Sequence, residues 1–395
     1  MGADLGRRTM DVPPPVVDIL RQLEAAGHET WCVGGAVRDA LLGNPQQDVD
    51  LATAALPAEV RRLFRRTVPV GIEHGTVGVL DDDGTLHEVT TFRRDVTTDG
   101  RHAVVAFGVS LDDDLARRDF TINAIAYHPL HETFKDPFNG RGDLALRVVR
   151  AVGHPPDRFR EDRLRIFRAL RFAARFDFVI DPDTFAAAQS EAASTHHLSA
   201  ERVRDEWVKG IATAAEPATL AALWEDAGVA AVWLDADEVL PLRTLPRDPV
   251  LSLAAWRRPV EPILRRLRMS GAEILRGRLV DRGPATPPTA ASRDVRRWLA
   301  GVGPAADDLM QLTALAGGGG DWRAEVSATR SRGDATSRSA LALTGDDLVQ
   351  ARLATPGPDL GRLLAALLDH VLDHPEANNR AALLHLAETR GRSAD

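Results

Sequence analysis

Residues 31–50, WCVGGAVRDALLGNPQQDVD, decide the fold of the first part of the chain. Apolar residues recur at helical spacing after the glycine pair, and Gly43-Asn44-Pro45 ends the predicted helix. The segment Asp48-Val49-Asp50-Leu51 is typical of the start of a strand. Residues two apart on a strand point to the same face, with Cα atoms roughly 6.5 Å apart. We therefore expect Asp48 and Asp50 to present two carboxylates side by side.

Two neighbouring carboxylates repel each other unless a cation lies between them. A pair of Mg²⁺ ions about 3.5–4 Å apart is the usual agent of in-line phosphoryl or nucleotidyl displacement, and such ions take oxygen ligands. Gly34 and Gly35 allow a phosphate to approach the backbone, and the N-terminus of the following helix attracts anions. A glycine pair or an Asp-x-Asp pair alone is common in solvated loops. The two together, joined by Arg38-Asp39, predict a metal-dependent phosphate site.

This segment resembles the signature GG-x-VRD-x-x-LG…D-x-D of the nucleotidyltransferase superfamily that includes DNA polymerase β. Class II tRNA nucleotidyltransferases (CCA-adding enzymes) and their poly(A) polymerase relatives use this form. The resemblance implies an α+β fold, with a polymerase β-like head followed by all-α neck, body and tail domains. It also implies that Asp48 and Asp50 are catalytic and hold Mg²⁺, and that Gly34, Gly35 and Arg38 hold the triphosphate.

The segments up to residue 92 predict helices and strands of a small α+β sheet domain of ~150 residues. Glu88, on a predicted strand over residues 86–92, is a candidate third carboxylate of the kind this superfamily often places on a neighbouring strand. An exposed glutamate at a strand edge is the commoner case, so its catalytic role stays open.

Residues 91–108 are polar and arginine-rich, and predict an exposed loop with a turn at Asp99-Gly100. In the resembled family this position holds a flexible loop that is needed to add the final A. Enzymes that add only CC carry a shortened version. The length of this segment therefore favours an enzyme that is able to add A.

Residues 112–127, DDDLARRDFTINAIAY, contain the family's RRDFTINA motif without a change. Residues 121–126 have helical spacing, with Ile122, Ile125 and Ala126 inward. By resemblance, Arg118, Asp119 and Asn123 contact the sugar and phosphates of the incoming nucleotide. Arginine suits this role because its planar fork binds phosphate oxygens bidentately.

Residues 158–176, RFREDRLRIFRALRFAARF, form the densest basic stretch and predict a helix. Asp162 and Arg165, within the family's ED-x-x-R motif, would be neighbours on one helix face. A carboxylate accepts hydrogen bonds and a guanidinium donates them, so the pair matches the amino group and ring nitrogen that cytosine and adenine share. Uracil and guanine reverse this pattern. Arg168 is predicted to bind the nucleotide as well.

The later segments predict helical domains. Glu201, Arg202, Glu206 and Lys209 resemble the next family motif and would brace the base-reading helix. Residues 341–384 resemble the tail that docks on the tRNA elbow in CCA-adding enzymes, and residues 327–338 predict an irregular segment. We predict a head at 1–143, a neck at 144–215, an RNA-binding body at 216–340 and a tail at 341–395.

Composition limits the class of protein further. The 395 residues carry a net charge of −8, which argues mildly against a nucleic-acid partner, although the arginines are clustered. Cys32 is the only cysteine, which excludes an internal disulfide and a zinc-cysteine site. No apolar run predicts a membrane span and no signal-peptide pattern is present, so we expect a cytoplasmic protein. The sequence does not predict an oligomeric state.

The predicted function is template-independent addition of CCA to the 3′ end of tRNA from CTP and then ATP. An enzyme that adds only A or only CC shares every motif quoted and stays open. A poly(A) polymerase is disfavoured by the tail, and a catalytically silent RNA-binding protein by the intact Asp48 and Asp50.

Overall fold

The structure is a computed structural model that describes residues 9–45, 48–98 and 103–391. The chain divides into two compact units, Met1–Asp235 and Ala236–Asp395. The finer division into four domains stays a prediction. No helix among the described residues is long and apolar enough to cross a membrane.

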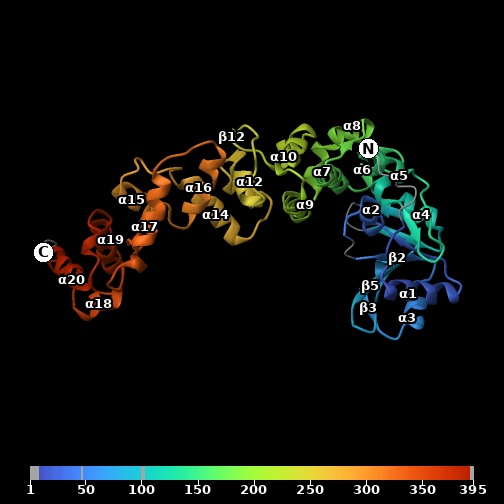
Figure 1. Cartoon of the computed structure of the whole chain (residues 1–395), viewed down its shortest axis with the longest axis horizontal. Coiled ribbons are helices and arrows are strands. Elements are labelled where there is room, and N and C mark those ends of the chain that lie inside the picture. Colours follow the sequence, from blue (N-terminus) through green and yellow to red (C-terminus); the bar gives the residue numbers. More distant parts are fainter. Residues whose placement is uncertain (1–8, 46–47, 99–102, 392–395) are drawn as a thin grey trace. The chain divides into compact units, whose positions relative to one another are not determined.

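Within the described residues, the first unit is built on a seven-stranded mixed sheet (Figure 1). Its strands are β1 (Thr30–Val33), β2 (Asp50–Thr53), β3 (Thr67–Gly71), β4 (Thr76–Leu80), β5 (Leu86–Thr91), β8 (Ala126–His128) and β9 (Thr133–Lys135). Their order is β3-β4-β5-β2-β1-β8-β9, and β2 with β5 is the parallel pair. This mixed sheet confirms the predicted α+β head.

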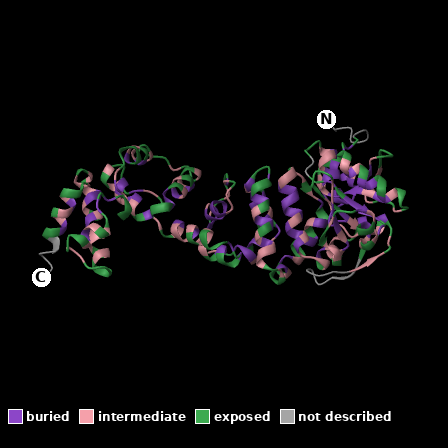
Figure 2. Cartoon of the chain, turned by 90° about the horizontal axis from the view of Figure 1, so that it is seen from below, coloured by how far each residue is buried: buried purple, intermediate pink, exposed green. Residues whose placement is uncertain are grey.

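Helices pack around this sheet and bury its apolar residues (Figure 2). α1 and α3 contact each other and the strands, while α2 follows β1 directly. The helices of this part are α1 (Pro14–Ala25), α2 (Gly35–Leu42), α3 (Pro57–Leu63), α4 (Leu111–Ala116) and α5 (Gly140–Leu146). Gly43 ends α2 in the left-handed conformation, as expected for a helix that stops at glycine.

Two segments of the head differ from the predictions. Residues 91–108 contain the hairpin β6 (Arg93–Thr98) and β7 (Ala103–Phe107) rather than a loop, because apolar β-branched residues favour strand pairing. The predicted turn at Asp99-Gly100 lies outside the described residues.

Residues 121–126 do not form the predicted helix. A short 3₁₀ turn, η2 (Thr121–Asn123), is followed by β8, because Ala126 pairs with Val33 in the sheet. Pairing with β1 overrides the local helical spacing. Ile122, Ile125 and Ala126 are nevertheless fully buried, so the predicted inward face was right.

The rest of the first unit is mainly helical, with one short parallel pair of strands, β10 (Val148–Val149) and β11 (Val179–Ile180). Phe167, Trp207 and Trp224 form its aromatic core through edge-to-face contacts. The helices are α6 (Pro155–Glu161), α7 (Leu164–Phe176), α8 (Pro182–Glu191), α9 (Ala200–Thr213), α10 (Pro217–Asp226) and α11 (Val229–Trp233).

The second unit is a series of short helices. They are α12 (Pro249–Ala254), α13 (Glu261–Arg266), α14 (Gly271–Arg282), α15 (Ser292–Val302), α16 (Ala306–Leu315), α17 (Trp322–Arg332), α18 (Gly345–Gln350), α19 (Pro358–Asp373) and α20 (Arg380–Gly391). α17 covers the first half of residues 327–338, so the predicted irregular segment was wrong there. Val326 and Thr329 bury one side of this otherwise polar helix, and that tertiary packing stabilises it.

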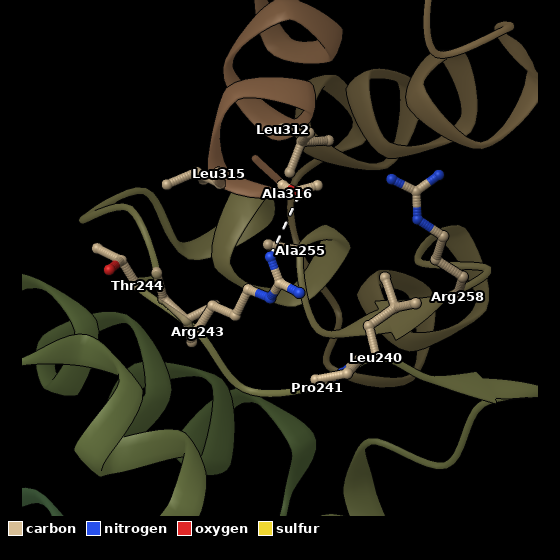
Figure 3. Close-up of a pocket in the computed structure, with 10 residues that line it drawn as sticks. Leu240, Pro241, Arg243, Thr244, Ala255, Arg258, Leu312, Leu315 and Ala316 are labelled. Carbon is tan, nitrogen blue, oxygen red and sulfur yellow. Dashed lines mark hydrogen bonds between the residues drawn. The ribbon is translucent and has the colours of Figure 1, made fainter. Parts of the chain in front are cut away.

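A small cavity of about 170 Å³ lies within the second unit, beside the end of α16 (Figure 3). Leu240, Leu312 and Leu315 give it an apolar lining. Arg243 reaches across it and donates a 3.3 Å hydrogen bond to the carbonyl of Ala316. A guanidinium at this point satisfies a carbonyl at the C-terminal end of the helix.

Candidate active site

One open cavity of about 570 Å³ in the first unit brings together all of the predicted site residues except Asp48. Residues of α2, β2 and the segment after α4 meet the start of α7 there. The predicted residues that line it are Gly34, Gly35, Arg38, Asp50, Arg118, Asp119, Asn123, Asp162, Arg165 and Arg168. Stretches more than a hundred residues apart in the sequence therefore form one site.

The acidic part of the site lies at the start of β2. Asp50 is the first residue of that strand, and Asp48 lies two residues before it. Leu51 pairs with Val89 in the parallel β2–β5 ladder. Asp50 and Glu88 are the residues immediately before this pair, so they occupy neighbouring positions on the two strands. Loss of hydration, together with the negative charges of Glu88 and Asp48, raises the pKa of Asp50 to about 6, and Arg118 opposes this rise. These carboxylates therefore interact, and they form a donor set that suits a hard divalent cation.

The glycine turn lies directly beside these carboxylates. Gly34 has φ +79° and ψ −140°, a backbone region that essentially only glycine occupies. A Cβ atom at this position would lie 3.2 Å from Nη1 of Arg118 and 3.9 Å from Oδ2 of Asp50. The turn thus leaves free the space between the arginine and the carboxylate, and α2 begins at the next residue.

Gly34→Ala is expected to raise KM for CTP by about tenfold, because the new methyl group would displace Arg118 and strain the turn by ~1–3 kcal/mol. Steady-state kinetics and thermal unfolding would measure the two effects. Gly27→Ala is the matched control, since Gly27 has φ +89° with nothing within 4 Å of its Cβ position. An equal rise in KM in the Gly27 variant would show that backbone strain alone causes the effect.

The RRDFTINA segment supplies cations that are held in place by buried carboxylates. Asp114 accepts hydrogen bonds from Arg117 at 2.8 Å and from Arg118 at 3.2 Å. Burial opposes the ionisation of Asp114, but these two guanidinium groups keep its pKa below the usual range. Both arginines are therefore fixed before a ligand arrives, with part of each side chain still exposed.

Asp119 and Asn123 join this segment to α2 and α7. Asp119 pairs with Arg168 at 2.7 Å and accepts a 2.9 Å hydrogen bond from the amide of Asn123. Burial alone would raise the pKa of Asp119, but Arg168 and Asn123 lower it. The side-chain oxygen of Asn123 in turn accepts a 2.6 Å hydrogen bond from Arg38. Burial lowers the pKa of Arg38, whose guanidinium also pairs with Asp39.

The structure corrects the predicted geometry of Asp162 and Arg165. They do not share a helix face, because the predicted helix breaks between α6 and α7 and Asp162 is extended, with φ −150°. The Asp162 carboxylate accepts a 3.0 Å hydrogen bond from the backbone N–H of Leu164, which favours a new helix start over a continuous helix. Both side chains still line the cavity.

Contacts from inside and outside the motif hold each member of this pair. Arg165 donates to Glu161 and to the carbonyl of Arg117, each at 3.0 Å. Arg202 of α9 pairs with the second oxygen of Asp162 at 2.7 Å.

Two of the predicted bracing residues contact Asp162 and α7, as expected. Besides the contact from Arg202, Glu206 forms a buried ion pair with Arg171 of α7 at 2.5 Å. The roles of Glu201 and Lys209 stay predictions.

The sequence analysis did not assign several side chains that line the cavity. They are Arg117, Leu164, Arg171, Phe172 and Arg175, whereas Arg202, which also lines the cavity, was predicted as a bracing residue. Arg168, Phe172 and Arg175 are four and three residues apart on α7, so they share a helix face. That spacing could have identified Phe172 and Arg175 once Arg168 was chosen.

Three family models match segments of this chain. The poly(A) polymerase head domain model matches residues 30–150, and the model for a probable RNA- and SrmB-binding site of polymerase A matches residues 177–230. A model for a putative tRNA nucleotidyltransferase domain 2 matches residues 324–387.

Two similar proteins and one similar crystal structure are CCA-adding enzymes. The CCA-adding enzyme of Lactiplantibacillus plantarum is 36% identical over 93% of this chain and 94% of its own length. That of Limosilactobacillus fermentum is 36% identical over 94% of this chain and 96% of its own. The crystal structure of the Bacillus stearothermophilus CCA-adding enzyme in complex with CTP is 29% identical, with a TM-score of 0.74 over 97% of this chain and 100% of that one.

Proposed function

The chain belongs to the CCA-adding enzyme family of tRNA nucleotidyltransferases, and we propose that it adds CCA to the 3′ end of tRNA from CTP and then ATP. One observation carries this proposal. Asp50, which we assign as a nucleotidyltransferase carboxylate, lines the same cavity as Asp162 and Arg165, which we assign as the base-reading pair. A phosphoryl-transfer site alone would not need that pair.

Asp50, with Asp48 and Glu88 beside it, fits a divalent metal site. Burial, and then the neighbouring negative charges, raise the pKa of Asp50, and a bound cation would compensate those charges. We assign Asp48 and Asp50 as the residues that would hold Mg²⁺, with Glu88 as a candidate third ligand. When bound, Mg²⁺ would supply Lewis acidity for attack by the RNA 3′ hydroxyl and for departure of pyrophosphate.

The residues on the other side of the turn would hold the triphosphate. Gly34 and Gly35 leave room for phosphate oxygens, and Arg38 and Arg118 present guanidinium groups to them. The Asp119 carboxylate would accept hydrogen bonds from the sugar hydroxyls, and the Asn123 amide would donate to them. Arg168 fixes the position of Asp119, and Arg38 fixes that of Asn123.

Base choice would follow from hydrogen-bond matching. Asp162 accepts from the amino group of cytosine or adenine, and Arg165 donates to the adjacent ring nitrogen. Protein side chains would thus replace a nucleic-acid template. The second unit would bind tRNA, with residues 341–395 at the elbow, and the protein would act in the cytoplasm.

A primer assay tests the proposed function. Purified protein with Mg²⁺ is expected to extend tRNA lacking CCA with CTP and ATP, and tRNA ending in CC with ATP. Sequencing of the extended ends measures which nucleotides are added. Incorporation of only A or only C would reduce the function to one of the partial activities, and no incorporation on either RNA would refute the enzyme assignment.

A further inference from the structure

Phe172 lies on α7 in the wall of the cavity, and its side chain is only 4% exposed. Three guanidinium groups approach its ring: the Cζ atoms of Arg38, Arg168 and Arg171 lie 5.1, 5.4 and 4.5 Å from the ring centroid. Cations within about 6 Å of an aromatic centroid are attracted by the negative ring face. One ring therefore contacts cations of two elements, α2 and α7.

Two of these arginines lead to the nucleotide-binding residues of the head. Arg38 donates to the side-chain oxygen of Asn123 at 2.6 Å, and Arg168 pairs with Asp119 at 2.7 Å. The first contact joins α2 to the RRDFTINA segment, and the second joins α7 to the same segment. A shift of the Phe172 ring would therefore displace Arg38 and Arg168, and with them the contacts to the triphosphate and the sugar.

The third arginine leads to the base-reading side. Arg171 pairs with Glu206 on α9, and Arg202 of the same helix holds Asp162. The ring is thus the point where contacts from the triphosphate side and from the base-reading side meet.

We propose that Phe172 is a positioning residue that couples base recognition to triphosphate binding. The inference rests on the proposed function. α7 starts two residues after Asp162, so a mismatched base that displaces the start of this helix also displaces the ring. Arg38 then loses its contact with the Phe172 ring, and the triphosphate of the wrong nucleotide is bound more weakly.

Phe172→Leu, which keeps an apolar side chain and removes the aromatic face, tests the proposal. We expect the dissociation constant for CTP, measured without tRNA, to rise about tenfold, as loss of the cation–π contacts would give. The preference for CTP over UTP in kcat/KM is expected to fall about fivefold, with kcat at saturating CTP within about threefold of the parent. Phe172→Tyr keeps the ring face and is expected to restore both quantities.

Phe134→Leu is the matched control. The Cζ atom of Arg141 lies 4.7 Å from the centroid of the Phe134 ring, and neither residue lines the cavity. If the two leucine variants lose thermal stability alike and neither changes CTP affinity or base preference, the positioning role is refuted. If Phe172→Leu does not fold, Phe172→Met replaces it in the same measurements, with the same expected results. CTP incorporation by the parent chain is measured alongside: its absence would refute the proposed function, whereas parent-like CTP affinity and selectivity in Phe172→Leu would refute only the positioning role.

Discussion

Asp50→Ala is expected to lower kcat for CTP addition by about 10³-fold or more, which corresponds to roughly 4 kcal/mol of lost transition-state stabilisation. The reason is its position: Asp50 opens the strand beside Glu88 and faces the cavity next to the glycine turn. Removing its carboxylate would remove the oxygen ligand around which a divalent cation is held. Single-turnover incorporation of labelled CTP into tRNA lacking CCA measures this step directly.

Asp48→Ala is expected to behave in the same way, while tRNA binding survives in both variants. RNA affinity is dominated by contacts with phosphates, and neither carboxylate contributes favourably to those. Asp82→Ala, in the exposed turn before β5, is the control for loss of an acidic side chain. Equal losses of tRNA binding and of transfer in the Asp48 variant would mean that this carboxylate has a structural role.

Glu88→Gln decides whether the third carboxylate takes part. A loss of kcat comparable to that of Asp50→Ala would identify Glu88 as a catalytic ligand. Near-parent activity would leave it as a neighbour that only raises the pKa of Asp50. The parallel ladder between β2 and β5 makes the question specific, because it places these two carboxylates at adjacent positions.

The sequence predicted the glycine turn, the helix after it and a strand at Asp50, because their geometry is local, but the strand begins at Asp50, so Asp48 lies before it and does not line the cavity. The turn at Gly34, the helix after it and the strand at Asp50 all lie within twenty residues, and each has its own signal of spacing or composition. Helix and strand periodicities act over this range. The fold of the head followed from the same patterns.

Other parts of the site depend on contacts that no local pattern encodes. Asp162 leaves the helix because its side chain bonds to the N–H of Leu164, and its second oxygen is held by Arg202, forty residues later. Asp and Asn side chains compete with the backbone in this way, so helical spacing does not decide the outcome. Thr121–Asn123 likewise stops after one 3₁₀ turn because the next strand pairs with β1.

The same contacts determine what Asp162 can still do. A carboxylate has about four acceptor positions, and Leu164 and Arg202 use one on each oxygen. Positions therefore remain for the amino group of a base. Arg165 likewise gives one N–H to Glu161 and one to the carbonyl of Arg117, so donors remain for a ring nitrogen.

Asp162→Ala is therefore expected to lower the preference for CTP over UTP by about 10–100-fold, while the affinity for the triphosphate changes much less. A good bidentate contact to a base discriminates by roughly 1–3 kcal/mol, and the triphosphate contacts lie on α2 and the RRDFTINA segment. Competition between labelled CTP and UTP on tRNA lacking CCA measures the preference, and pyrophosphate or triphosphate inhibition measures the phosphate affinity.

Asp157→Ala is the matched control, since Asp157 lies on α6 and makes exposed pairs with His154 and Arg160. It is expected to keep parent selectivity. Arg202→Ala should produce a weaker form of the Asp162 effect, because it frees one oxygen of that carboxylate without removing it. If base preference is unchanged in Asp162→Ala, protein side chains do not template the addition. The Asp162 carboxylate would then serve only to start α7 and to hold Arg202, and the choice of CTP would have to come from another part of the cavity.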